Sequence, residues 1–341
     1  MTAPSHQTLP PAREINLPRS YCLTGDGKFR RDLAPRELGE VRAEPASQIW
    51  VDVDSTNRAQ FAVLEKIFGF HHLAIEDTLN PATRPKLEDY GDYLFLVIRG
   101  IRFVEETEDP YDLETSNLYC FLGRDYLVTV HAGSSPSIAA VAERIDRSPE
   151  LLGRGAQRLL HAIADAEIDR YFPLLDRIDD FVDGLEERVF ADFDRDALRD
   201  IFSVKRLTLT LRRHLAPQRE VFNLLTNRPS GLLAPETQIY FRDIYDHVLR
   251  INESLETYRE LLSSTMDSYL TQVSNRLGTV TKALSVVATL SIPFVVVSGM
   301  WGMNFREVPL SESPGGFWIM LLLQLAIGFG LLAFLRWQRW L

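Results

Sequence analysis

The last part of the chain contains two long apolar runs. Residues 283–303 and residues 315–335 each form a stretch of 21 positions without a charged side chain. A helix needs roughly 20 apolar residues to cross the hydrocarbon core of a bilayer. The pattern therefore predicts two membrane-spanning helices joined by a short loop.

The first half of the chain has a different pattern, in which apolar and β-branched residues alternate over short distances. The strand-like segments are 47–53, 93–103 and 118–131, the last with a hairpin turn at Gly123-Arg124-Asp125, and helical spacing occupies 59–70 and 71–80. Strands that alternate with helices predict an α/β domain that ends at about residue 150. The first residues of the chain are rich in Pro, Arg and Glu and are expected to be irregular.

Helical spacing replaces the strand pattern in the second half. Two amphipathic helices are predicted over 157–190 and 194–225, and the first is densely acidic. Neither a proline nor a tight turn interrupts the chain between Glu236 and Pro293, which predicts one helix over 237–302. Such a helix would be ~100 Å long at 1.5 Å per residue. It cannot be stable alone and must pack against copies of itself or against the preceding helix pair.

The charge distribution changes this picture in two ways. The net charge of -10 argues against nucleic acid as a partner and is compatible with binding cations. Arg276 and Lys282 flank the first apolar run and Arg336 and Arg339 follow the second, whereas the loop holds one Arg and two Glu. Positive charge stays on the cytoplasmic side of membranes, so both termini and the large domain are expected in the cytoplasm.

The first apolar run carries polar groups that the second lacks. Ser285, Thr289 and Ile292 follow i, i+4, i+7 spacing and share one face, whereas the second run has only Gln324. The two spans of one chain enclose no channel, so a pore would need several copies with the first span of each lining the axis. The alternative is that the hydroxyl groups bond back to their own helix.

The first run ends in Gly302-Met303-Asn304. Mg²⁺ gives up its water reluctantly, so a ring of neutral Asn oxygens is suited to holding its hydration shell. The alternative is that Asn304 only caps the helix or starts the turn, as Asn commonly does. Spacing alone does not distinguish these two roles.

These residues point to a known family. The Gly-Met-Asn sequence, followed by FREVP and combined with two C-terminal spans, resembles the signature of the CorA divalent-cation transporters. Segments 75–100, 240–251 and 266–294 also resemble the corresponding family segments. The resemblance covers about residues 60–341.

The resemblance implies a homopentameric funnel, in which a cytosolic α/β/α sandwich feeds a long helical stalk and two C-terminal transmembrane helices. Gly302, Met303 and Asn304 would form the selectivity mouth. Leu284, Ser285, Thr289 and Ile292 would line the pore below it, with Leu284 at a hydrophobic constriction. The expected parts are a variable segment 1–45, the α/β domain 46–155, an acidic antiparallel helix pair 156–235, the stalk 236–282, the pore-lining span 283–304, the loop 305–314, the second span 315–335 and the tail 336–341.

The resemblance also implies a regulatory site. In related proteins, carboxylates between neighbouring cytosolic domains bind Mg²⁺ and hold the closed state. Here these carboxylates fall on Asp77 and Asp243, with Glu76 and Asp165 as an adjoining second site. Mg²⁺ keeps several waters, so two carboxylates suffice for a weak site. The alternative is that all four are ordinary solvated charges on helix ends and polar faces.

Mg²⁺ would then be both cargo and regulator, with no organic cofactor. The leading interpretation is gated, passive influx of Mg²⁺, with Co²⁺ and Ni²⁺ as surrogates, by a homopentamer in lipid at a bacterial-type inner membrane. The alternative is a ZntB-type Zn²⁺ transporter coupled to protons, because segment 212–222 resembles that branch.

Gly278 replaces a frequent family Asn, and Arg306 adds positive charge near the mouth. No nucleophile–base arrangement stands out, so an enzyme is not expected.

Overall fold

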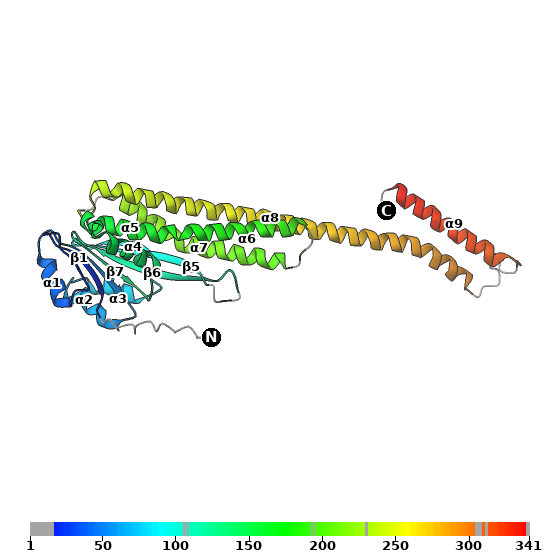
Figure 1. The fold of residues 1–341 in the computed structure, drawn as a ribbon. Helices are drawn as coiled ribbons and strands as arrows, with labels where there is room; N and C mark the ends of the chain where they lie inside the picture. The colour runs from blue at the N-terminus through cyan, green and yellow to red at the C-terminus, as the bar shows by residue number, and fades with distance from the viewer. Residues whose placement is uncertain are drawn as a thin grey trace, which may run out of the picture. The chain divides into compact units, whose positions relative to one another are not determined.

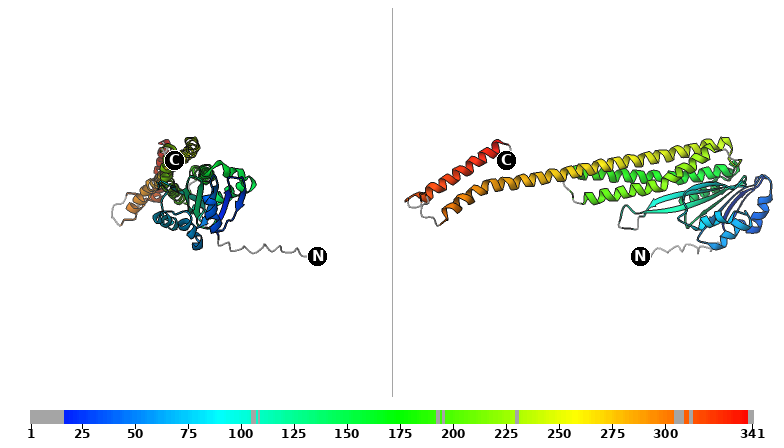
Figure 2. Two further views of the ribbon diagram at one scale, coloured as in Figure 1. Left: turned by 90° about the vertical axis from the view of Figure 1, so that its left-hand side faces the viewer. Right: turned by 180° about the vertical axis from the view of Figure 1, so that it is seen from behind.

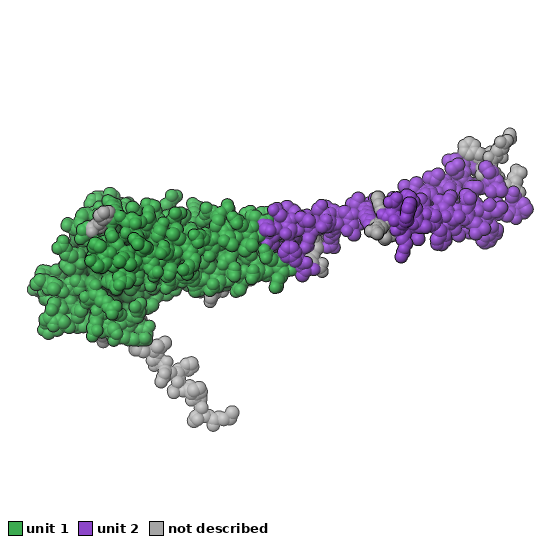
Figure 3. Space-filling model, turned by 90° about the horizontal axis from the view of Figure 1, so that it is seen from above, with its two compact units in different colours: residues 1–187, 199–263 green, residues 188–198, 264–341 purple. Residues whose placement is uncertain are grey.

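The computed structural model describes residues 17–104, 107, 109–191, 194, 196–228, 231–303, 309–310 and 313–338. It has two compact units, coloured separately in Figure 3. The first consists of Met1–Glu187 and Arg199–Ser263, and the second of Arg188–Leu198 and Ser264–Leu341. Helix α8 (Pro235–Trp301) contributes residues to both units.

The first unit contains a seven-stranded sheet with the order β2-β1-β3-β7-β6-β5-β4 (Figure 1). The strands are β1 (Arg19–Leu23), β2 (Phe29–Arg31), β3 (Gln48–Asp54), β4 (Lys86–Asp89), β5 (Leu94–Phe103), β6 (Leu113–Leu122) and β7 (Tyr126–His131). Only the β3–β7 pair is parallel among the described strands. The predicted hairpin over 118–131 is confirmed, and it closes where the Gly123 amide donates to the Tyr126 carbonyl over 2.9 Å.

The sheet begins earlier in the chain than the sequence predicted. β1 pairs with β3, and the Tyr21 ring stacks on Trp50 with ring centroids 4.9 Å apart. The α/β domain therefore extends back to Arg19, into the segment 1–45 that was expected to be variable. Strands of five and three residues are too short for alternation to reveal them.

Helices cover both faces of the sheet, as Figure 2 shows from two sides. One face packs on α1 (Pro35–Ala43), η1 (Arg58–Phe61), α2 (Ala62–Lys66) and α3 (His72–Leu79). The other face packs on α4 (Pro136–Arg147), η2 (Pro149–Arg154) and α5 (Ala156–Asp169). Because both faces are covered, β5, which lies next to the edge strand β4, is buried along nearly its whole length. The predicted α/β/α sandwich is confirmed.

Three further helices follow: α6 (Tyr171–Ala191), α7 (Ala197–Asn227) and α8. The single helix predicted over 157–190 is wrong, because the chain breaks at Arg170 between α5 and α6. Pro173 has no amide hydrogen to donate to the Asp169 carbonyl, which explains a break at this point.

The long helix predicted over 237–302 is confirmed as α8. Its buried positions in the first unit repeat at alternating steps of three and four residues, the spacing of coiled-coil packing. They are Phe241, Ile244, Val248, Ile251, Leu255, Tyr258 and Leu262. In the second unit, the end of α8 and helix α9 (Gly316–Trp337) are both long and apolar enough to cross a membrane.

Candidate metal centre

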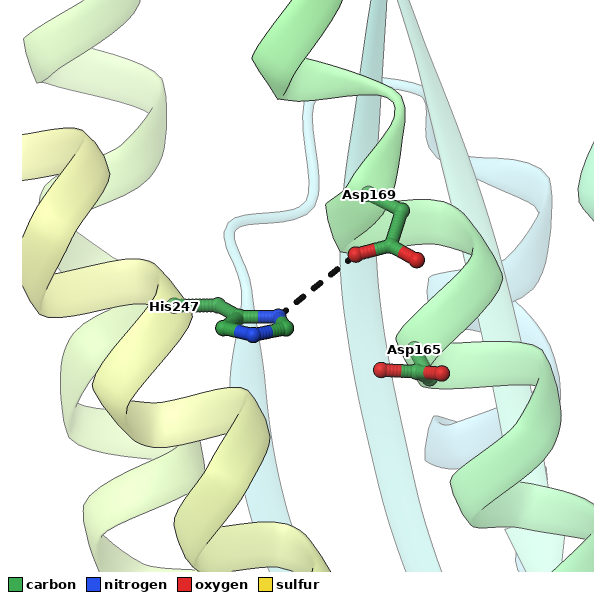
Figure 4. A group of neighbouring side chains, drawn as sticks. All are labelled: Asp165, Asp169 and His247. Atoms are coloured by element: carbon green, nitrogen blue, oxygen red, sulfur yellow. Dashed lines mark ion pairs between the residues drawn. The ribbon is translucent and has the colours of Figure 1, made fainter.

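Two carboxylates and an imidazole meet between α5 and α8. Asp165 and Asp169 lie one turn apart on α5, and His247 points toward them from α8 (Figure 4). Their potential ligand atoms all lie within 4.8 Å of one another, and His247 Nδ1 is 3.5 Å from Asp169 Oδ1. This group of three is called the α5–α8 cluster below.

The core spacing of the two helices explains why these side chains meet. On α8, Ile244 and Val248 point into the core, which leaves His247 at the edge of the buried face. On α5, Ala164 and Ile168 are buried in the same way, and Asp165 and Asp169 follow each of them by one residue. A residue that follows a buried position by one lies at the edge of the buried helix face. At this edge the two packed helices face each other, and their side chains are partly solvated.

The electrostatics of the cluster favour a bound cation. Burial raises the pKa of the Asp165 carboxyl group, and the neighbouring Asp169 and Asp243 carboxylates act in the same direction. His161 and His247 oppose this effect without cancelling it. Burial also lowers the pKa of His161, which favours its neutral form. Asp165 therefore lacks a sufficient cationic partner among the residues that the structure describes, and a divalent cation would supply one.

The structure brings together only some of the predicted regulatory residues. Asp243 lies close enough to Asp165 to affect its pKa. Asp77 and Glu76 lie on α3, which packs on the opposite face of the sheet from α5. Asp77 Oδ2 accepts a hydrogen bond from Lys86 Nζ over 2.7 Å. A site that joins Asp77 to Asp243 is thus not formed within one chain and stays a prediction about neighbouring copies.

Sequence reasoning missed Asp169 and His247. The available signal was spacing: Asp169 follows Asp165 by four residues, and His247 follows Asp243 by four. Side chains four apart share one helix face, so each pair could have been recognised as a two-residue ligand motif. That the two motifs face each other depends on the packing of α5 on α8, which spacing does not reveal.

The donor set has a clear chemical preference. Carboxylate oxygens suit Mg²⁺, which would retain several waters at such a site. The imidazole nitrogen of His247 adds a ligand that Co²⁺ and Zn²⁺ bind better than Mg²⁺ does. The α5–α8 cluster therefore fits a divalent cation and can accept either class.

The predicted pore-lining residues lie on one side of α8. Leu284 and Ile292 are 68% and 59% exposed, Thr289 is exposed and Ser285 is half-buried. Val286 is only 6% exposed, and the Phe294 ring lies against Gly328 of α9. Helix α9 thus covers a different side of α8 from the one that carries the predicted lining.

The predicted mouth lies at the end of this helix. Gly302 follows the last helical residue, and its amide donates to the Ser298 carbonyl over 3.0 Å. Met303 comes next and is exposed. Asn304, like Arg306, lies outside the described residues.

Comparisons with known proteins agree on one family. A family model described as "CorA-like Mg2+ transporter protein" matches residues 45–337. The chain is 30% identical over 302 residues to the cobalt/magnesium transport protein CorA of Thermotoga maritima, a match that covers 87% of this chain and 85% of that protein.

Solved structures share the fold. The complete structure of the CorA magnesium transporter from Methanocaldococcus jannaschii matches with a TM-score of 0.80 at 22% identity, covering 94% of this chain and 98% of that one. The ZntB cytoplasmic domain from Vibrio parahaemolyticus matches with a TM-score of 0.61 at 16% identity, covering 75% and 98%. At these identities the likeness concerns the fold, which combines the soluble α/β domain with a long helix.

Proposed function

The chain belongs to the CorA-like Mg²⁺ transporter family, and from this premise we propose that it forms a homopentameric pore for gated, passive Mg²⁺ influx. Transport of divalent cations follows from membership of the family. The observation that carries the finer proposal is helix α8, which is unbroken over 67 residues. One end of it bears Asp243 and His247, and the other bears the uncovered face with Leu284 and Ile292.

The uncovered face of α8 supports a pore between copies of the chain. Two spans enclose no channel, and α9 leaves Leu284, Thr289 and Ile292 exposed. If the first span of each copy faces a common axis, Leu284 forms an apolar ring that closes by dewetting. Thr289 and Asn304 then supply neutral oxygens to a hydrated cation, and Co²⁺ and Ni²⁺ pass as surrogates. The number five rests on the family resemblance.

Regulation by cytosolic Mg²⁺ is proposed to act through the carboxylates. Mg²⁺ held between Asp165 and Asp243 of one copy and Glu76 and Asp77 of the next would stabilise the closed pentamer. In the single chain, the Lys86 ammonium group donates a hydrogen bond to one carboxylate oxygen of Asp77. A bound ion would take the place of this ammonium group. When Mg²⁺ is lost, the unbalanced negative charges repel and the population shifts toward the open state.

A ZntB-type Zn²⁺ transporter, coupled to protons, is the second candidate. The observation that favours it is the imidazole of His247 in the α5–α8 cluster, a ligand type that Zn²⁺ prefers. The apolar runs 283–303 and 315–335 contain no His, Cys, Asp or Glu in the sequence, which favours a hydrated ion over a dehydrated Zn²⁺. Ion identity is therefore the quantity to measure.

The test is ion flux into proteoliposomes, measured for Mg²⁺ and Zn²⁺ separately, with and without a pH gradient. We expect Mg²⁺ flux that does not respond to the gradient and is lost in Asn304→Ala. Asn227→Ala, an exposed Asn at the end of α7, serves as the control and should transport normally. Zn²⁺ flux that rises with the gradient would support the second candidate. Absence of both fluxes, or a monomer mass in detergent, would refute the pore.

A further inference from the structure

A basic pocket lies beside the α5–α8 cluster. It is lined by residues of α4, η2, α5 and α8 and has a volume of about 140 Å³. Its polar lining consists of Arg144, Arg154, Arg158, His161 and Tyr240, and no described acidic residue lines it. Three guanidinium groups around one pocket are unexpected in a chain with a net charge of -10.

These arginines differ from their neighbours in having no ion-pair partner in the part of the chain that the structure describes. Arg147 on α4 pairs with Glu143, and Arg31 pairs with Asp146 over 2.8 Å. Among the described residues, no carboxylate lies within ion-pair distance of Arg144, Arg154 or Arg158. Like charges near one another repel, and a bound anion would relieve that repulsion.

Two side chains of the pocket are held in position. The Arg158 guanidinium stacks on the Tyr240 ring, with Cζ 3.3 Å from the ring centroid. The His161 ring also packs against Tyr240, at a centroid distance of 5.5 Å, and its Nε2 is buried with no hydrogen-bond partner in the described part of the chain. Tyr240 thus holds the Arg158 guanidinium group and the His161 ring in place at the wall of the pocket.

We propose that this pocket binds a small phosphate-class oxyanion, either inorganic phosphate or the phosphate groups of a nucleotide. The planar fork of a guanidinium group matches the oxygens of phosphate, and several arginines can share one anion. The pocket volume is several times the roughly 30 Å³ that one water occupies in the liquid. It accommodates a tetrahedral oxyanion, but only the phosphate part of a nucleotide.

The position of the pocket suggests that phosphate binding is coupled to cation binding at the α5–α8 cluster. This coupling rests on the proposed function. Arg158 and His161 lie on α5 ahead of Asp165, and Tyr240 precedes Asp243 on α8. An anion that neutralises the arginines removes positive charge that opposes cation binding at the α5–α8 cluster. Phosphate should therefore tighten cation binding, and the cation should tighten phosphate binding by the same factor.

The test measures binding of inorganic phosphate to the full-length chain in detergent by isothermal titration, without divalent ions and at constant ionic strength set with chloride. We expect saturable binding of one phosphate per chain. Arg144→Gln and Arg154→Gln change exposed residues and spare the fold, and Arg158→Gln changes the stacked one. Each should weaken binding roughly tenfold or more, the effect of losing one charge-assisted hydrogen bond.

Arg147→Gln is the matched control, since Arg147 lies on α4 but outside the pocket and already has a partner. It should bind phosphate as the wild type does. ATP and ADP form separate arms: a nucleotide that binds more tightly and displaces phosphate identifies the nucleotide as the source. If phosphate binds and nucleotides do not displace it, inorganic phosphate is the ligand.

Three results would overturn the proposal. Binding could be absent, or Arg147→Gln could weaken it as much as the pocket variants do. In the third case the wild type does not bind phosphate and the pocket variants change the oligomer mass. That result would mean that the arginines pair with another copy of the chain. Repeating the titration with Mg²⁺ and Asp165→Asn separates the two proposals, because that variant should abolish the coupling and leave phosphate binding intact. Loss of ion flux with intact phosphate binding would count only against the proposed transport function.

Discussion

The side chain of Gln324 on α9 donates a hydrogen bond to the hydroxyl of Ser298 on α8, over 3.0 Å. The same amide nitrogen lies 3.4 Å from the Phe294 carbonyl oxygen, and Gln324 is only 8% exposed. A polar side chain in hydrocarbon is costly unless a neighbouring helix satisfies it. The one Gln in an otherwise apolar second span therefore joins the two helices.

A double-mutant cycle tests this connection. Gln324→Ala and Ser298→Ala should each lower the free energy of unfolding in detergent, and the pair should show a coupling of about 0.6 kcal/mol, typical of such bonds in membranes. Ser291→Ala is the control, because Ser291 is exposed on α8 and forms no described bond to α9. Additive effects of Gln324→Ala and Ser298→Ala would show that the bond contributes nothing.

Two glycines on α9 provide a matched pair for a packing test. A Cβ at Gly328 would lie 2.6 Å from Cζ of Phe294, whereas a Cβ at Gly330 would have nothing within 4 Å. Overpacking costs about 1–3 kcal/mol, so Gly328→Ala should lower the thermal midpoint of the chain in detergent. Gly330→Ala makes the same change in helix propensity without the clash and should be neutral or slightly stabilising. Equal effects would contradict close packing at Gly328.

Long periodic elements were predictable from the sequence. The two apolar runs, the hairpin over 118–131 and the long helix α8 were all recognisable, because each depends on a pattern within a single segment. β1 and β2 were not, since β1 is stabilised by pairing with β3 and by stacking of Tyr21 on Trp50, and β2 pairs only with β1. Those contacts join residues that are far apart in the chain.

The candidate site was predictable only in part, for the same reason. Asp165 and Asp243 were identified through a family resemblance, and the structure places them near each other. His247 and Asp169 complete the ligand set only because α5 packs on α8 in one particular register. The basic pocket was missed entirely, since its arginines come from three separate elements that the sequence does not connect.

The raised pKa of Asp165 predicts a pH-dependent stability. A carboxyl group whose pKa is raised in the folded state favours folding while it is protonated, and this contribution is lost as the pH rises through the raised value. At neutral pH without divalent ions, Asp165→Asn should therefore unfold at a higher temperature than the wild type. Well below pH 4, where the carboxyl group is protonated in both states, the difference should disappear.

Saturating Mg²⁺ should reverse this order. The ion stabilises only a chain that binds it, so the wild type should gain more in thermal midpoint than Asp165→Asn does. Asp180→Asn, which removes an exposed carboxylate on α6, is the control and should follow the wild type under both conditions. If Asp165→Asn gains as much from Mg²⁺ as the wild type, Asp165 is not a ligand.

Gly278 offers a test of the inner pore. It lies within α8 and has nothing within 4 Å of the position of a Cβ, so a side chain is accommodated there without a clash. Gly278→Asn should preserve assembly and place a ring of amide oxygens where the family resemblance predicts an ion site. One added hydrogen bond to the hydrated ion, worth about 1 kcal/mol, would lower the KM for Mg²⁺ flux roughly 2- to 10-fold. Gly278→Ala makes the same backbone change without the amide and should leave KM unchanged. If Ala and Asn lower KM equally, the effect comes from a stiffer helix, and no ion site exists at this position.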